Sequence, residues 1–345
     1  MIILRTVKNI SSLNIAASVL LFLAAILAAV VANSSLSPVY QDFLLQELHL
    51  RIGNFNLFSH GGHPLKMIEF INDCLMTVFF LAVGLEIKRE LLVGELSSVR
   101  KAALPFIAAC GGMVVPVVIY ALSVASGTPE TRGMAIPMAT DIAFSLGVLS
   151  LLGKRVPLSL KIFLTAFAVV DDIGGILVIA LFYSADVAYG YLIAAAVLYV
   201  FLYYMGKFGV TQKIFFLFFG VIIWYLFLQS GIHSTISGVI LAFVIPARPR
   251  LDAGKYIERI RDIIGEFPVS KSDNIVLTNA QIATLKQVER ASDYVISPLQ
   301  SLEDNLHGAV SFVILPLFAF ANAGVVFSGS GSIVGDAVSY THLRA

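Results

Sequence analysis

Long runs of apolar residues constrain the fold of this chain more than any single motif does. A helix needs about 20 consecutive apolar residues to cross the hydrocarbon layer of a membrane. Hydrophobic residues make up 58% of the chain and charged residues 13%, a balance far from that of soluble domains. The sequence predicts an all-α polytopic membrane protein, with a single membrane domain over residues 1–337. Its nine expected spans lie near residues 13–33, 67–87, 102–124, 133–153, 157–183, 187–206, 211–228, 230–246 and 306–327.

Basic residues occur in alternate gaps between these runs. They precede the first run and follow the second, fourth, sixth and eighth, as in "EIKREL" and "GKRVPLSLK", whereas the other gaps carry few. Because Lys and Arg collect on the cytoplasmic side of a membrane, we expect a cytoplasmic N-terminus. The charges are confined to short gaps, so they report topology and give no reason to expect a nucleic-acid partner.

Two gaps are long enough to hold structure of their own. The stretch "LHLRIGNFNLFSHGGH" within residues 34–66 alternates around Gly-Asn, which predicts a small outer-face β-hairpin. Residues 45–63 are then either a homodimer contact or a folded loop. Residues 247–297 are of mixed charge with weak helical periodicity, and we expect them to form a cytoplasmic loop that acts as a tether or surface helix.

The last residues depart from the membrane pattern. The chain ends "VSYTHLRA", from Val338 to Ala345. A transposon-end adapter used to prepare sequencing libraries can encode this octapeptide. We therefore expect residues 338–345 to be a non-native tail on a C-terminally truncated chain. The alternative is an ordinary polar C-terminus.

Two adjacent carboxylates, Asp171 and Asp172, lie in the middle of the fifth run, in "AVVDDIGGILVIALF". An ionised residue at the bilayer centre costs about 2.5–3.5 kcal/mol on insertion scales, so such residues usually face a water-filled cavity or a counter-charge. Neighbouring positions on a helix point about 100° apart. One of the pair can therefore face an ion path while the other meets a cation. Lys161, on the same run, is roughly 15 Å away along the axis, so that cation must come from another segment.

A third carboxylate follows a helix breaker in the fourth run, "GMAIPMATDIAFSLGVLSLLG". Pro137 removes a helical hydrogen bond just before Thr140 and Asp141, and unwound backbone at this depth is tolerated where it lines a cavity. Carboxylate oxygens are hard ligands suited to Na⁺ or Li⁺, and they also bind protons. A single intramembrane Asp can be purely structural, but three on consecutive spans favour a site where a proton and a cation compete.

Several stretches resemble the NhaA-type sodium/proton antiporters. They are "ATDIAFSLGVLSLLGKRVPLSLKIFLTAFAVVDDIGGILVIALFY", "INDCLMTVFFLAVGLEIKREL", "GIHSTISGVI" and "LPLFAFANAGV". The resemblance implies an NhaA-like inverted-repeat fold in the inner membrane of a bacterium, and electrogenic, pH-regulated exchange of cytoplasmic Na⁺ or Li⁺ for external H⁺ in pH and sodium homeostasis. Asp141 and Asp172 match the residues that hold the transported Na⁺ or the protons. Thr140 lies beside them, and Asp171 matches a residue that pairs with a lysine.

That lysine belongs, in the family, to a tenth span of twelve. About nine of the twelve spans, and one of the two inverted repeats, precede the suspected tail. We therefore expect the parent protein to be an antiporter and residues 1–337 alone not to transport.

Charged residues also gather at the ends of the second and ninth runs. Glu86, Arg89 and Glu90 share one helix face by their spacing, which by itself is typical of a solvated helix end. The resemblance instead implies a pH-response cluster, in which Asp304 and Gly308-Ala309 depart from the family pattern. Its expected members are Glu86, Arg89, Glu90, His233, Glu303 and His307.

Two other functions compete with antiport. Broken helices with carboxylates also serve sodium-coupled symporters, but no polar region large enough for an organic substrate is evident. Intramembrane aspartyl proteases place two aspartates on neighbouring spans, but they carry glycines before the aspartate, whereas Gly174 and Gly175 follow it here. We expect a secondary transporter without a cofactor rather than an enzyme.

Overall fold

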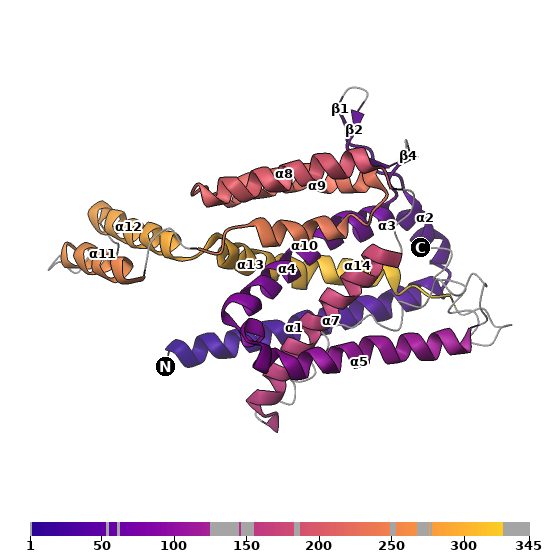
Figure 1. Cartoon of the computed structure of the whole chain (residues 1–345), viewed down its shortest axis with the longest axis horizontal. Helices are drawn as coiled ribbons and strands as arrows, with labels where there is room; N and C mark the ends of the chain where they lie inside the picture. The colour runs from indigo at the N-terminus through magenta and orange to yellow at the C-terminus, as the bar shows by residue number, and fades with distance from the viewer. Residues whose placement is uncertain are drawn as a thin grey trace.

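The computed structural model describes residues 2–52, 55–60, 63–124, 145, 155–182, 187–248, 253–267, 276 and 278–326. In this part the chain is mainly helical, and most helices run along one direction of the molecule (Figure 1). The α-helices are α1 (Ile2–Ala32), α2 (Ser37–Leu45), α3 (Met67–Glu69), α4 (Met76–Val93), α5 (Val99–Ser123), α7 (Leu158–Phe182), α8 (Tyr189–Lys207), α9 (Lys213–Ser230), α10 (Thr235–Val244), α11 (Ala253–Gly265), α12 (Asn279–Val295), α13 (Pro298–Ala309) and α14 (Leu315–Asn322).

Within the described residues, five helices are long and apolar enough to cross a membrane, or six if a bent pair counts as one span. The bent pair joins Ala16–Ala32 to Ser37–Leu45 at 113°. The long helices fit a polytopic membrane protein, but the expected number of nine spans is not confirmed. The five spans are Met67–Val93, Ala102–Ser123, Tyr189–Lys207, Lys213–Ser230 and Pro298–Asn322.

One of the expected spans is shorter than a membrane crossing in the structure. The span expected near 230–246 is the short helix α10, because Gly231 adopts a left-handed conformation (φ +80°) that ends α9, and helix resumes only at Thr235. The span expected near 157–183 falls on α7, a helix of 25 residues from Leu158 to Phe182. The span expected near 133–153 lies outside the described residues, apart from Ser145.

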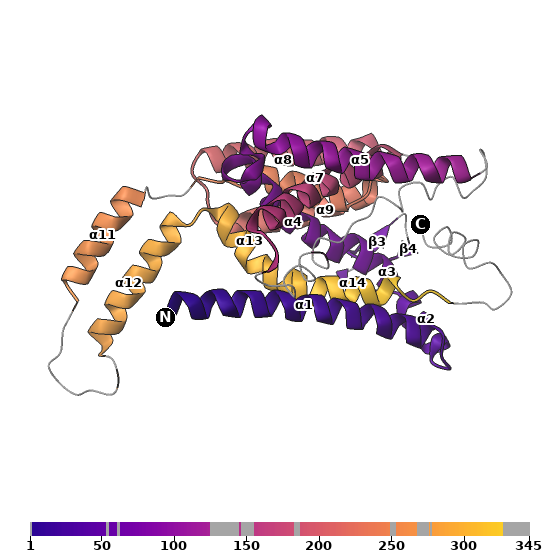
Figure 2. The ribbon, with the colours of Figure 1, turned by 90° about the horizontal axis from the view of Figure 1, so that it is seen from below.

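Helix α4 is the central element of the bundle because it contributes to two apolar clusters. Leu81 and Leu85 face the first cluster, with side chains from α8, α9, α10 and α13. Val83 and Ile87 face the second, with α5 and α7. In Figure 2 the helices of the first cluster lie together, with α1 and α14 along another side of the bundle. The fully buried members of the first cluster include Leu85, Leu202, Phe216, Ile223 and Ile245.

Glycines allow α4 and α10 to approach closely. A Cβ atom on Gly84 would lie 2.8 Å from the Cβ of Ala242 and 3.1 Å from the Cα of Val239. A Cβ on Gly238 would collide with the backbone oxygen of Thr77. Small residues are enriched where membrane helices pack, since backbones in close contact maximise van der Waals attraction. The α4–α10 contact therefore depends on having hydrogen at both positions.

Two spans contain a π-helical turn. Segment η1 (Phe70–Leu75) leads into α4, and segment η5 (Val310–Ile314) joins α13 to α14. The amides of Asn72 and Asn322 bond to each other between these spans, at 2.8 and 3.3 Å. The carbonyl oxygen of Asp73 in η1 accepts bonds from Trp224 Nε1 and Ser234 Oγ, both at 3.2 Å. Asp73 thus helps to attach η1 to α9 and α10.

Residues 46–66 form two short antiparallel pairs of strands. The strands β1 (Arg51–Ile52) and β2 (Phe55–Asn56) pair with each other, as do β3 (Ser59–His60) and β4 (His63–Pro64). Leu65 and Phe58 pack on Trp224 and Leu228 of α9. The second pair of strands is therefore held at the end of α9, as Figure 1 shows.

The region 247–297 holds two helices, α11 and α12, which extend away from the bundle side by side (Figures 1 and 2). The hydroxyl oxygens of Tyr256 and Ser292 lie 2.9 Å apart and link the two helices. The Thr278 side chain accepts a bond from Gln281 N, which caps the start of α12.

We expect Gly84→Leu to destabilise the protein by about 1–3 kcal/mol, since the new side chain must displace α10. The thermal midpoint in detergent, followed by fluorescence-detected gel filtration, measures this. Gly111→Leu on α5 is the matched control, because a Cβ there meets nothing within 4 Å. Equal midpoints for the two variants would contradict the close α4–α10 contact.

Candidate functional site

Asp171 is buried in α7, with only 4% of its surface exposed. Its neighbours Val169 and Val170 belong to the apolar cluster between α4, α5 and α7. Asp172 continues the same helix, but only its backbone is described. Asp141 and Thr140 lie outside the described residues. The proposed cation site therefore remains a prediction. Among the described side chains, no group of three or more His, Cys, Asp or Glu residues is arranged to hold a metal ion.

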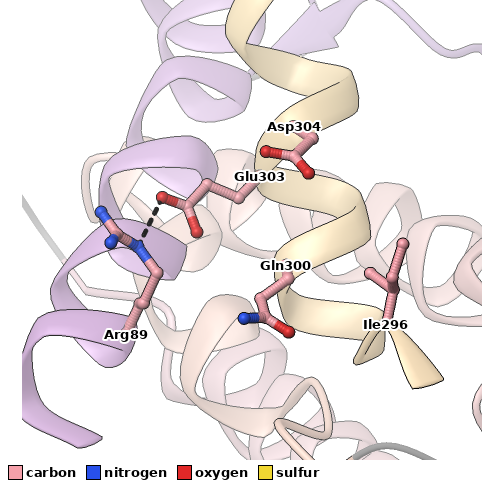
Figure 3. Close-up of a pocket in the computed structure, with 5 residues that line it drawn as sticks. All are labelled: Arg89, Ile296, Gln300, Glu303 and Asp304. Atoms are coloured by element: carbon pink, nitrogen blue, oxygen red, sulfur yellow. Dashed lines mark hydrogen bonds and ion pairs between the residues drawn. The ribbon is translucent and has the colours of Figure 1, made fainter. Parts of the chain in front are cut away.

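An ion pair joins α4 to α13 at the end of the second span. The Nε atom of Arg89 donates to Glu303 Oε1 at 2.9 Å (Figure 3). The Nη2 atom of Arg89 lies 3.3 Å from Glu90 Oε1. Arg89 keeps 36% of its side chain exposed and Glu303 keeps 20%. Pairs this exposed contribute roughly 0.2–1 kcal/mol, so the contact can be broken and remade easily.

A pocket of about 430 Å³ opens beside this ion pair. Arg89 enters it from α4, and the other lining residues come from α13 and the segment before it (Figure 3). The lining holds two carboxylates and one guanidinium, and the guanidinium already pairs with one of the carboxylates. The lining residues are Arg89, Ile296, Gln300, Glu303 and Asp304.

The structure brings together four of the six residues expected in the pH-response cluster. Glu86 interacts electrostatically with Glu303, Arg89 and Glu90, one helical turn before Arg89 on α4. His307 lies one turn beyond Glu303 on α13, where it is exposed.

His233 does not lie with the other cluster residues. It is exposed and directly precedes Ser234, whose hydroxyl bonds to Asp73 near the start of the second span. Arg89 is near the end of that span, roughly 24 Å away along the helix. A role for His233 in the pH response remains a prediction, and it would have to act from this distance.

Lys88 makes a contact that the sequence did not reveal. Its ammonium group donates to the carbonyl oxygens of Ala242 at 3.3 Å and Phe243 at 2.7 Å, and also to that of Ile245. The sequence marks Lys88 only as one of several basic residues in a cytoplasmic gap. A signal was present in the Ile-Pro step after α10, since a helix ending there leaves carbonyls without intrahelical donors.

The family model described as Na⁺/H⁺ antiporter 1 matches residues 8–341. A protein named Na⁺/H⁺ antiporter NhaA from Bacteroides thetaiotaomicron is 76% identical over 97% of this chain and 76% of its own length. Proteins of the same name from Bacteroides fragilis and Parabacteroides distasonis are 75% and 51% identical, over 97% and 94% of this chain and 77% and 73% of their own. The chain thus spans about three-quarters of these relatives.

These comparisons agree with the long apolar helices. The relatives are secondary transporters rather than enzymes, which removes the support for an intramembrane protease. Their bacterial origin and the five apolar helices found in the described residues fit a multi-pass protein of a bacterial inner membrane. The chain therefore belongs to the Na⁺/H⁺ antiporter 1 family of secondary transporters.

Proposed function

We propose that the protein exchanges cytoplasmic Na⁺ or Li⁺ for external H⁺ across the inner membrane, in pH and sodium homeostasis. The observation that carries this proposal is the match of residues 8–341 to the Na⁺/H⁺ antiporter 1 family. The sequence adds a chemical reason, since Asp141 and Asp172 offer carboxylates on consecutive spans, one of them beside a helix breaker.

Exchange follows if protons and the cation exclude one another from the same carboxylates. In the protonated state Asp141 and Asp172 are neutral and have little attraction for Na⁺. When both have released their protons, they present hard, charged oxygens to the ion, with the Thr140 hydroxyl beside them. Two protons released for each monovalent cation would move net charge, so the proposed exchange is electrogenic.

Asp171 has a different proposed role from that of its neighbour. Its position lies about 100° away from that of Asp172 around the helix axis, and it is buried, next to Val169 and Val170 of the second apolar cluster. A charge in such surroundings needs a partner to remain ionised. We propose that Asp171 meets a lysine, as the resemblance implies, and so holds the α7 side of the site.

The proposed pH-response element is the cluster formed by Glu86, Arg89, Glu90 and Glu303. Arg89 bridges Glu90 on its own helix and Glu303 on α13, and Glu86 adds a third carboxylate. Three carboxylates surround one cation, and repulsion between like charges favours the neutral form of a carboxyl group. The charge of the cluster, and hence the α4–α13 contact, would therefore depend on pH. This would couple the ambient pH to the packing of the second span.

We also propose that the 45–63 segment mediates a homodimer. Its strands are short and extend beyond the end of α9 (Figure 1). Exposed strand edges offer backbone groups for pairing with another chain.

Asp172→Asn is expected to abolish exchange, because asparagine can neither release a proton nor carry the charge that attracts Na⁺. The measurement is Na⁺-dependent dequenching of a pH-gradient dye in everted membrane vesicles. Asp262→Asn on α11 is the matched control, since Asp262 lies on the exposed side of a helix outside the apolar spans. Exchange retained in Asp172→Asn at normal membrane levels would refute the site.

Two versions of the protein are needed for that experiment. One is residues 1–337, which are expected not to transport. The other adds the segments of the Bacteroides thetaiotaomicron relative that this chain does not cover. Robust dequenching by residues 1–337 alone would contradict the expectation of inactivity. A sodium-coupled symporter would not dissipate the proton gradient on addition of Na⁺ alone.

Reversing one charge of the Arg89–Glu303 pair should shift the pH of half-maximal exchange, by up to about 0.7 pH unit for a pair worth about 1 kcal/mol. We expect Arg89→Glu and Glu303→Arg each to cause a shift and the double swap to restore the wild-type profile. Arg89→Glu combined with Glu258→Arg on α11 is the control and should not restore it. A double swap no better than either single variant would exclude the pair as the pH-response element.

Deleting residues 51–56 should convert the protein from dimer to monomer, since it removes β1 and β2 while leaving β3 and β4 held on α9. The mass in detergent, measured by light scattering after gel filtration, tests this. An unchanged mass would place the dimer contact elsewhere.

A further inference from the structure

Lys88 caps the end of α10 with its whole ammonium group. All three of its N–H bonds have acceptors, and all three acceptors are carbonyl oxygens in the last turn of α10 or just after it. The last carbonyls of a helix lack intrahelical donors and carry the negative end of the helix dipole. A flexible point charge with three rotatable donors suits this position better than a planar guanidinium does.

The end of α10 is in turn attached to the start of α13. The backbone N–H of Leu299 donates to the carbonyl oxygen of Pro246 at 3.3 Å. Ile245, Leu299 and Leu302 are buried in one apolar cluster. The first turn of α13 is therefore attached to the end of α10. Lys88 in turn links the end of α10 to α4.

Glu303 is on α13 about one turn after this attachment, and Arg89 follows Lys88 directly on α4. Two routes thus connect α4 to α13. One is the Arg89–Glu303 ion pair, and the other runs from Lys88 through α10 and Pro246 to Leu299. The first route is partly exposed and weak by itself, so its geometry depends on how the second holds the two backbones.

The charged groups near the ion pair come from three helices. On α4 they are Glu86 and Glu90, and on α13 they are Asp304 and His307. From α9, Lys213 bonds to Ser301 Oγ of α13 at 2.7 Å. Helix α10 carries no charged residue between Thr235 and Val244, so Lys88 reaches the cluster through the backbone of α10 and not through a charge on it.

We propose that Lys88 is a positioning residue, which holds the end of α10 and thereby fixes Glu303 of α13 opposite Arg89. The role in transport rests on the proposed pH-response function of that pair. The geometric role does not, and it is tested separately.

The geometric test is a double-mutant cycle on thermal unfolding in detergent. Lys88→Met and Glu303→Gln should each lower the midpoint. In the Lys88→Met background, the loss caused by Glu303→Gln should fall by at least half, because the pair is already misaligned. In the Lys88→Arg background, which keeps the charge and the donors, Glu303→Gln should still cause at least half of the loss in midpoint that it causes in the unsubstituted protein. Lys207→Met, at the exposed end of α8, is the matched control and should leave the effect of Glu303→Gln unchanged.

Additive losses in that cycle would overturn the proposal, since a lysine that only anchors α10 would not change how much the Arg89–Glu303 ion pair contributes to stability. The transport test uses the pH profile of exchange in everted vesicles. Lys88→Met should shift the profile as Glu303→Gln does, and the double variant should shift it no further. These profiles are measured in the version completed with the segments of the Bacteroides thetaiotaomicron relative. If that version shows no exchange without substitutions, the proposed function fails, while the thermal cycle still decides the role of Lys88.

Discussion

The close contact between α4 and α10 is the interaction on which the central part of the bundle depends. Hydrogen atoms in place of side chains at Gly84 and Gly238 bring the two backbones together. That contact places Lys88 within reach of the α10 carbonyls and carries α13 to the same end of α4. In a membrane, an apolar side chain gains little free energy by moving from lipid into a helix contact. Van der Waals packing and hydrogen bonds must therefore hold such a bundle together. Helix α4 provides both, since it packs closely along α10 and its Lys88 donates hydrogen bonds to the end of α10.

The apolar runs predicted much of the described helical pattern. The spans expected near 102–124, 187–206 and 211–228 coincide with Ala102–Ser123, Tyr189–Lys207 and Lys213–Ser230, because the length and composition of a run are local properties. The run near 230–246 was too long by comparison with α10. Most residues of this run are apolar, so hydropathy does not show that the left-handed conformation of Gly231 ends one helix and delays the next.

The candidate site depends more on contacts distant in sequence, which no local pattern reveals. Arg89 and Glu303 are 214 positions apart, and only the resemblance to a family grouped them before the structure did. Spacing could place Glu86, Arg89 and Glu90 on one face, but it could not show that His233 lies toward the other end of the second span. Lys88 was overlooked for a related reason. Its partners are backbone carbonyls, which every residue carries. The Ile-Pro step after α10 marks where such carbonyls lack intrahelical donors, but it does not show which side chain reaches them.

The π-helical turns in the second and ninth spans have a consequence for how these helices present their side chains. Each such turn inserts an extra residue into the helical repeat, so the faces on its two sides are out of phase by roughly 100°. In the span Met67–Val93, Asn72 lies within the inserted turn and Arg89 lies well beyond it, yet both bond to the same partner span, Pro298–Asn322. A single helical wheel drawn through the whole span would misplace one of them. The side chains before and after each π-helical turn must therefore be assigned to helix faces separately.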